Sequence, residues 1–423
     1  YAKENYLKSI SLNPDTPEFY NNFGNLEYNN GNFNEAYQNY LLAINKNKEK
    51  FKYLPSLIGL PHSSIYPKIN NLIHSYKKYS SEFSEEKLIN ENREVIALRS
   101  FGRSGTLFLH SLVDGHEEIS TLPGYFFKGW FGKEVWKQLK PDYTQDNWRE
   151  LLAENIFIYF EPQFNASKKG NVPGEPNKTS WLGESTGFTS LGENSDKTLS
   201  LDKSEFTYNF INLIENEQSI TQGKCFELVH DAFDKAYRIQ DMKIPSNKKK
   251  IFYHIHNPNN EELLNFILHY PKAKFLYIIR HPIQSMESWL VLHFEKIFTS
   301  KDNKEIIREW HEIIEKIRAM FYFFLNPINT QTNNYGIKLE DLKKETDVTL
   351  DKLCKFIDIK KTNSLFNSEF LNYAFSRPST SKNNVSAFST ESIDLKIGRY
   401  FSSRDIKVFN HIFYSFLIKF NYP

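Results

Sequence analysis

A short run of glycine, serine and arginine at residues 102–106 follows an apolar stretch and precedes a helical pattern. A turn of this kind between a strand and a helix leaves several backbone N–H groups unpaired, and the helix dipole adds partial positive charge. The run therefore predicts a cradle for phosphate or sulfate oxygens. Its members are Arg103, Ser104, Gly105 and Thr106. An ordinary helix N-terminus is the alternative interpretation.

The cation in this run is an arginine. In the P-loop of nucleoside triphosphatases, G-x-x-x-x-G-K-[ST], a lysine contacts the terminal phosphates. No lysine stands at that place here, and Arg103 precedes the Ser-Gly-Thr triplet. Because a guanidinium bonds two oxygens at once, arginine suits a large, weakly basic oxyanion. The pattern argues against a triphosphate-hydrolysing site.

A second run of this kind lies later in the chain. Residues 274–279 are almost continuously apolar, as in a parallel strand covered on both faces, and Arg280 ends them. Ser288 follows eight positions later, inside the next helical pattern. An arginine at the carboxyl end of a parallel strand points into the crevice where α/β proteins bind nucleotides. The alternatives are a structural ion pair for Arg280 and a helix-surface hydroxyl for Ser288.

Together the two runs resemble the sulfotransferases that use 3'-phosphoadenosine-5'-phosphosulfate (PAPS), over about residues 93–420. The resemblance implies that Arg103, Ser104, Gly105 and Thr106 hold the 5'-phosphosulfate, and that Arg280 and Ser288 hold the 3'-phosphate. It also implies PAPS as co-substrate, with the desulfated nucleotide as product. The segment 339–342, Leu-Glu-Asp-Leu, and the helical pattern after it are similar to the family's tail.

Sulfuryl transfer needs a base for the acceptor's proton and cations at the charge that develops on the leaving phosphate. Arg103 and the loop amides supply the cations. The family places a histidine before the 3'-phosphate arginine, which favours His256 as the base, although His254 then stands where the family has a lysine. Glu184 and Glu117 are the alternatives, because other members use a glutamate. A structural role for His256 also stays open.

The family closes its nucleotide site with a basic loop near the C-terminus. Lys382, or Lys396 with Arg399 around Gly398, is expected to serve, and neither choice matches the family pattern cleanly. Aromatic residues at 125–131 either line an acceptor pocket or form core.

The fold expected is a three-layer, P-loop-like α/β domain with a mostly parallel sheet at residues 93–423. A helical connector is expected at 51–92 and an all-α segment at 1–50. Offsetting the opening by 34 residues pairs Ala2 with Ala36 and Tyr6 with Tyr40, which resembles the tetratricopeptide (TPR) repeat. Because such repeats bury their cores by stacking, we expect further repeats upstream or docking onto the domain downstream. Residues 165–178 are expected to form a loop, and residues 404–420 one helix.

The composition excludes some classes of partner. With 53 Lys+Arg against 51 Asp+Glu, the net charge of +2 gives no global case for nucleic acid or an anionic membrane. Cys225 and Cys354 are too few for a disulfide framework, fit a cytoplasmic location, and are best interpreted as small buried residues. No metal cluster and no membrane-spanning segment are expected.

The function predicted is sulfuryl transfer from PAPS to a hydroxyl or amine of a protein, peptide or carbohydrate. The TPR-like helices are expected to bind a protein partner. A nucleotide-dependent kinase and a non-catalytic TPR scaffold with a degenerate nucleotide fold are the alternatives.

Overall fold

The fold was analysed in a computed structural model of the chain. It describes residues 2–30, 32–46, 93–100, 102–124, 127, 129–167, 170–172, 175–180, 188–237, 248–255, 260–325, 333–375 and 388–423. The helical stretch expected within residues 51–92 lies outside these ranges.

A five-stranded sheet, all of whose strands run parallel, forms the centre of the molecule. Its order is β2-β5-β1-β6-β7. The strands are β1 (Glu94–Ser100), β2 (Ile119–Thr121), β5 (Lys250–Ile255), β6 (Lys274–Ile279) and β7 (Asn334–Lys338). The apolar runs before the two predicted anion motifs are thus the central strand β1 and its neighbour β6. Because parallel strands share one carboxyl edge, both motifs leave the sheet at the same edge.

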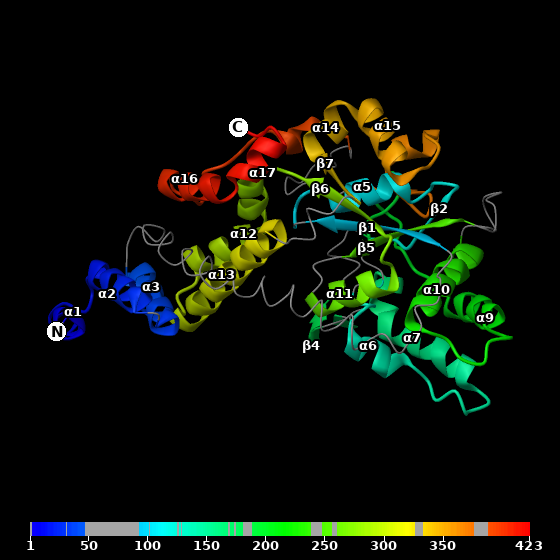
Figure 1. The fold of residues 1–423 in the computed structure, drawn as a ribbon, viewed down its shortest axis with the longest axis horizontal. Helices are drawn as coiled ribbons and strands as arrows, with labels where there is room; N and C mark the ends of the chain where they lie inside the picture. The colour runs from blue at the N-terminus through cyan, green and yellow to red at the C-terminus, as the bar shows by residue number, and fades with distance from the viewer. Residues whose placement is uncertain are drawn as a thin grey trace.

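Alternate residues of the central strands face two different apolar clusters. On β1, Val95 and Ala97 pack with one cluster, while Ile96 and Leu98 pack with the other. The first cluster draws on α6 (Lys133–Leu139), α7 (Trp148–Phe164), α9 (Lys203–Leu213), α10 (Gln222–Tyr237) and α11 (Asn260–His269). The second draws on α5 (Thr106–Val113), α14 (Leu339–Lys344) and α15 (Thr346–Ile357). Helices therefore cover both faces, which confirms the predicted three-layer α/β architecture (Figure 1).

A third cluster lies beside the sheet. It joins α12 (Pro282–Thr299) and α13 (Asn303–Leu325) to the C-terminal helices α16 (Ser403–Ile412) and α17 (Tyr414–Lys419). Pro282 begins α12, where its missing N–H is not needed.

The N-terminal segment forms three helices: α1 (Ala2–Leu12), α2 (Pro17–Asn29) and α3 (Phe33–Lys46). A methyl group at Gly24 would lie 2.6 Å from the Tyr40 ring, so a glycine there lets α2 and α3 pack closely. Tyr20, Tyr40 and Ala43 belong to the same apolar cluster as α12 and α13. The N-terminal helices thus share a core with α12 and α13, as docking requires. Their assignment as TPR repeats stays a prediction.

Two expectations about local structure were wrong. Within residues 165–178, expected as a loop, β3 (Gly170–Val172) pairs with β4 (Glu175–Ser180) in an antiparallel hairpin. The two strands form a sheet of their own, separate from the central one. Residues 404–420, expected as one helix, divide into α16 and α17 at Phe413, whose buried ring joins the third cluster.

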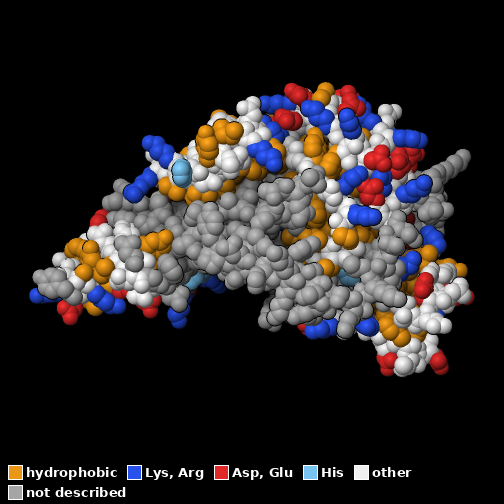
Figure 2. Space-filling view, viewed as in Figure 1, with side chains coloured by type: hydrophobic (Ala, Val, Ile, Leu, Met, Phe, Trp, Pro, Cys, Tyr) orange, Lys and Arg blue, Asp and Glu red, His pale blue; other side chains and the backbone are white. Residues whose placement is uncertain are grey.

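Minor elements complete the fold: the pair β8 (Glu369–Phe370) and β9 (Tyr373–Ala374), and the 3-10 helices η2 (Asn363–Phe366) and η3 (Thr390–Ile393). Cys225 and Cys354 are both buried and unbridged, as predicted. Basic and acidic side chains are interspersed over α14 and α15 on the face in Figure 2, in keeping with the balanced net charge. In the part of the chain that the structure describes, no helix has the length and apolarity to cross a membrane.

Candidate active site

The loop after β1 has the geometry of an anion cradle. Gly105 caps α5 with φ of 98°, a left-handed conformation that favours glycine. A methyl group there would also lie 2.7 Å from Leu339 on α14. Ser104 and Thr106 on either side are almost fully buried, at 1% and 6% exposure. The backbone N–H groups at the start of α5 are therefore fixed by packing rather than by a side-chain cap.

Arg103 precedes this cap and joins the two predicted motifs. Its own backbone is left-handed, with φ of 65°, and its side chain is exposed. Its carbonyl oxygen accepts a long hydrogen bond of 3.5 Å from Nη1 of Arg280. The structure thus brings together two arginines that are 177 residues apart in the chain.

Helix α12 approaches the same loop. A methyl group at Gly102 would lie 3.4 Å from the indole of Trp289, so the ring packs against the loop backbone. Ser288, the residue before it, is partly buried. The second predicted motif therefore contacts the loop of the first at two places. One contact is made by Arg280 at its start, and the other by Trp289, the residue after Ser288.

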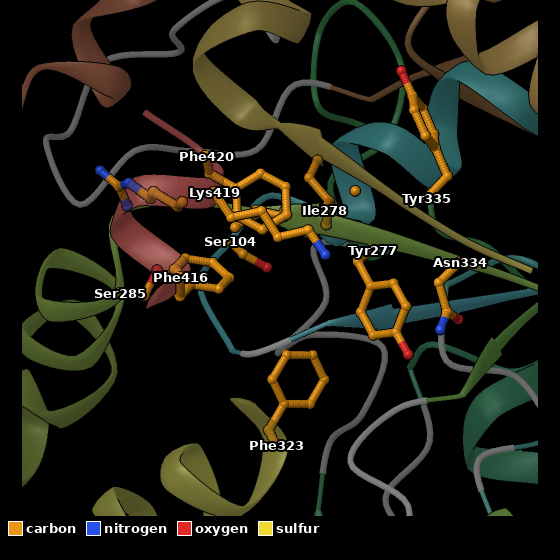
Figure 3. A pocket seen from close by; sticks show the side chains of 13 residues that line it. Ser104, Tyr277, Ile278, Ser285, Phe323, Asn334, Tyr335, Phe416, Lys419 and Phe420 are labelled. Carbon is orange, nitrogen blue, oxygen red and sulfur yellow. The ribbon is translucent and has the colours of Figure 1, made fainter. Parts of the chain in front are cut away.

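A cavity of about 280 Å³ lies beside these residues. Helix α17 contributes Phe416 and Lys419 to its wall, Phe420 follows directly after that helix, and Phe323 of α13 lies across from them (Figure 3). Its other lining residues are Ser104, Tyr277, Ile278, Ile279, Arg280, Ser285, Asn334, Tyr335 and Gly336. The cavity thus combines an aromatic wall with polar groups from both predicted motifs.

Ser285, rather than Ser288, is the serine of α12 that lines this cavity. Its side chain is 1% exposed, and its hydroxyl has no hydrogen-bond partner among the described residues. A buried hydroxyl left unpaired costs free energy. Sequence reasoning missed Ser285, because the eight-residue spacing pointed to Ser288.

A lysine missed by sequence reasoning adds positive charge near Arg280. Lys343 on α14 lies with its Nζ 5.2 Å from the centre of the Phe108 ring and donates to the Ser389 carbonyl at 2.8 Å. Burial, and then the charge of Arg280, lower the pKa of Lys343 to about 8. Because the charge of Arg280 disfavours the charged form of Lys343, an anion bound near both residues would be stabilised. The sequence feature that could have pointed to Lys343 is its position directly after the Leu-Glu-Asp-Leu segment at residues 339–342.

Arg99 on β1 contacts two residues that line the cavity. It is 3% exposed, donates to the Tyr277 hydroxyl at 3.0 Å and lies 5.3 Å from the centre of the Phe323 ring. It therefore links the central strand to two residues of the cavity wall.

Two of the predicted general bases, His256 and Glu184, lie outside the described residues. In the sequence His256 is the residue after β5. That strand ends at Ile255, which pairs with Arg99, so it ends at the same edge of the sheet as β1. Its neighbour His254 is buried on β5. Glu117 is exposed just before β2, which starts in register with the first residue of β5. Glu117 is therefore at the opposite edge of the sheet, about 20 Å from the loop, and this position contradicts its expected role as a base.

The aromatic run at residues 125–131 belongs to the core where it is described. Phe127, Trp130 and Phe131 are each 0% exposed, within the cluster on the α10 and α11 side of the sheet. Phe131 contacts the rings of Phe226 and Tyr253 edge-on. The core interpretation is thus the correct one for these three residues.

The sheet, the glycine-capped loop and the paired arginines define a class of protein. The chain matches the sulfotransferase family over residues 96–363, more than half of its length, and it belongs to that family. A comparison with curated proteins found no match.

Solved structures give distant likenesses. The sulfotransferase domain of the Synechococcus PCC 7002 olefin synthase is 13% identical and has a TM-score of 0.39, with 78% of this chain and 96% of that chain covered. The sulfotransferase domain from the curacin biosynthetic pathway is 14% identical, with a TM-score of 0.41 and coverage of 79% and 99%. Sulfotransferase STF9 from Mycobacterium avium is 11% identical, with a TM-score of 0.37 and coverage of 90% and 90%. Since these scores are below 0.5, membership rests on the family match.

Proposed function

We propose that this sulfotransferase takes its sulfuryl group from PAPS. The observation that carries the proposal is the contact between Arg280 and the Arg103 carbonyl, because it joins a cradle suited to one anionic group with an arginine suited to a second. PAPS carries a phosphosulfate at one end of its ribose and a phosphate at the other. Lys343 adds a further cation to this region.

In the proposed reaction, the acceptor oxygen or nitrogen forms a bond to sulfur while the bond from sulfur to the 5'-phosphate oxygen breaks. A base takes the acceptor's proton, and the leaving phosphate keeps the bonding electrons. Arg103 and the N–H groups at the start of α5 stabilise the charge on that phosphate. No step needs a metal ion.

His256 is the first choice for the base and Glu184 the second. His256→Ala should reduce turnover while donor binding stays intact. An unchanged rate in that variant passes the role to Glu184 or to another residue, and Glu184→Gln measured in parallel decides between these two.

The acceptor is proposed to be a hydroxyl or amine of a protein, peptide or carbohydrate. The domain is proposed to begin at residue 93, after a connector at 51–92 and TPR-like helices that bind a protein partner. A cytoplasmic location is part of the same proposal, since both cysteines are unbridged.

Calorimetry with the intact chain tests the donor. Adenosine 3',5'-bisphosphate, the product of PAPS, is expected to bind at least about tenfold more tightly than adenosine 5'-phosphate, because only the former engages Arg280. Preferential binding of ATP would instead support the kinase alternative. Binding of no nucleotide would support the non-catalytic scaffold.

A further inference from the structure

Tyr422, which follows α17, donates a hydrogen bond to a carboxylate at the start of α14. Its hydroxyl lies 2.8 Å from Oε2 of Glu340, where the chain after α17 meets α14 (Figure 1). Among the described residues, this is the hydrogen bond that Glu340 makes, and no ion pair involves its carboxylate. The partner of this acid is therefore a neutral hydroxyl rather than a cation.

The same carboxylate lies close to Arg280. Ile279 of β6 pairs with Lys338 of the parallel strand β7, so the residues that follow the two strands leave the sheet side by side. These residues include Arg280 after β6 and Glu340 after β7. Burial lowers the pKa of Arg280, and the negative charge of Glu340 is the main influence that opposes this shift. Because carboxylates bond strongly to guanidinium groups, Glu340 is placed to compete with a phosphate for Arg280.

The ring of Tyr422 is held on three sides. The His281 ring meets it edge-on, with 5.4 Å between the ring centres. Phe416 of α17 stacks on it at 6.5 Å, and Nζ of Lys338 lies 4.6 Å from its centre. Because these contacts are made by the ring, a change that removes only the hydroxyl should leave the ring in place.

The hydroxyl of Tyr422 is a lasting donor. Burial, and then the negative charge of Glu340, raise the pKa of Tyr422 well above its usual value, so the hydroxyl keeps its proton near pH 7. Its hydrogen bond occupies one carboxylate oxygen and fixes the orientation of the group. Arg280 meanwhile donates to the Arg103 carbonyl. The two contacts thus hold the carboxylate and the guanidinium on different partners.

We infer that Tyr422 is a positioning residue, which keeps the Glu340 carboxylate from pairing with Arg280, so that the guanidinium binds the 3'-phosphate of the nucleotide. Without the hydroxyl, Glu340 pairs with Arg280, and the phosphate must displace it. This inference rests on the proposed function, since it concerns the same nucleotide.

The test is binding of adenosine 3',5'-bisphosphate to the full chain by calorimetry. Tyr422→Phe keeps the ring and removes the hydroxyl. The affinity for the bisphosphate should fall about fivefold, which is the most that a partly exposed ion pair between Glu340 and Arg280 is worth. The affinity for adenosine 5'-phosphate, which lacks the 3'-phosphate, should change less than about twofold. An unchanged affinity for the bisphosphate, or an equal loss for both nucleotides, would contradict the inference.

A second substitution separates positioning from general destabilisation. Glu340→Gln removes the competing charge, so this variant should bind the bisphosphate at least as tightly as the unaltered chain. Adding Tyr422→Phe to it should then weaken binding less than about twofold, because no carboxylate is left there to pair with Arg280. A merely structural role of the hydroxyl predicts the full loss in both backgrounds, and that result would overturn the inference. Weaker binding by Glu340→Gln alone would also contradict it.

Asp341 supplies the matched control for the charge. It is the exposed neighbour of Glu340, and its charge also acts on Tyr422. Asp341→Asn should not restore binding of the bisphosphate to the Tyr422→Phe protein. Restored binding would mean that any loss of negative charge in this region suffices, which contradicts a specific competition by Glu340.

Tyr143 supplies the control for the loss of a hydroxyl. Its partly buried hydroxyl donates to the Ile220 carbonyl at 2.6 Å, and its ring meets Trp148 edge-on. Tyr143→Phe should lower the melting temperature as Tyr422→Phe does, yet leave binding of the bisphosphate unchanged. Equal losses of binding in the two variants would show that the Tyr422 hydroxyl is only structural.

The result also distinguishes this inference from the proposed function. If the unaltered chain binds no bisphosphate, both are overturned. If it binds the bisphosphate and Tyr422→Phe binds equally well, the proposed function stands and the positioning role is contradicted.

Discussion

Nη1 of Arg280 donates to the main-chain oxygen of Arg103 at 3.5 Å, which fixes the end of β6 against the loop after β1. The acceptor is a carbonyl rather than a carboxylate, so this bond itself is not an ion pair. At 3.5 Å the bond is also long enough to be exchanged for a shorter one to an anion. The contact thus holds the Arg280 guanidinium against the backbone of the loop that carries Arg103.

Arg280→Ala should weaken binding of adenosine 3',5'-bisphosphate by about 10- to 100-fold, because a charge-assisted pair with a phosphate is lost. Binding of adenosine 5'-phosphate should fall much less. Calorimetry with both nucleotides measures the difference. Arg404→Ala, an exposed position on α16, is the control and should match the unaltered chain. An unchanged affinity for the bisphosphate would contradict the assigned role of Arg280.

Ser285→Ala should stabilise the free protein by up to about 1 kcal/mol, because it removes an unpaired buried hydroxyl. The same change should weaken binding of the bisphosphate severalfold, since the hydroxyl is then missing from the cavity. Ser288→Ala should weaken binding without the gain in stability. Thermal unfolding and calorimetry on the two variants provide the measurements. If the Ser285→Ala protein were more stable and bound the bisphosphate normally, the cavity would not be part of the nucleotide site.

Donor affinity should fall as the pH rises through about 8. Burial and Arg280 lower the pKa of Lys343 to about 8, so its ammonium is charged below that pH and neutral above it. An anionic ligand binds the charged form more tightly, and binding should therefore be accompanied by proton uptake near pH 8. Calorimetry in buffers of different ionisation enthalpy measures that uptake.

Lys343→Gln should abolish this pH dependence, while Lys344→Gln, at the exposed neighbouring position on α14, should retain it. If the pH dependence persists in Lys343→Gln, the proton taken up on binding belongs to another group.

Gly105→Ala should destabilise the fold by about 1–2 kcal/mol, because alanine adopts a left-handed backbone with strain and its methyl group would meet Leu339 at 2.7 Å. Gly102→Ala provides the comparison, since a methyl group there would meet Trp289 at an ordinary 3.4 Å. Urea unfolding of the two variants should rank Gly105→Ala as the less stable. The reverse order would mean that the loop relaxes around the added methyl group.

Strong local patterns explain what the sequence predicted well. The apolar runs of β1 and β6 are buried on both faces, and Pro282 marks the start of α12, so strands and motifs were placed from neighbouring residues alone. The short strands β2 and β3 gave no comparable signal, since a run of three residues is too short to show a period.

The residues that complete the candidate site depend on contacts between distant parts of the chain. Lys343 can be recognised as a site residue only from its contact with the Phe108 ring and from the effect of the Arg280 charge on its pKa. Glu340 looks like any helical glutamate until Tyr422 folds onto it. The choice between Ser285 and Ser288 depends on the rotation of α12 against the cavity, which the spacing of two motifs does not determine.

The most direct test of the central claim is transfer of radioactive sulfur from labelled PAPS to a panel of phenol, peptide and carbohydrate acceptors. The unaltered chain is predicted to label at least one acceptor class, and Arg103→Ala is predicted to lower that rate by about 100-fold or more, because it removes the charge that stabilises the leaving phosphate. Normal turnover by Arg103→Ala, with the protein folded, would contradict the account of this loop.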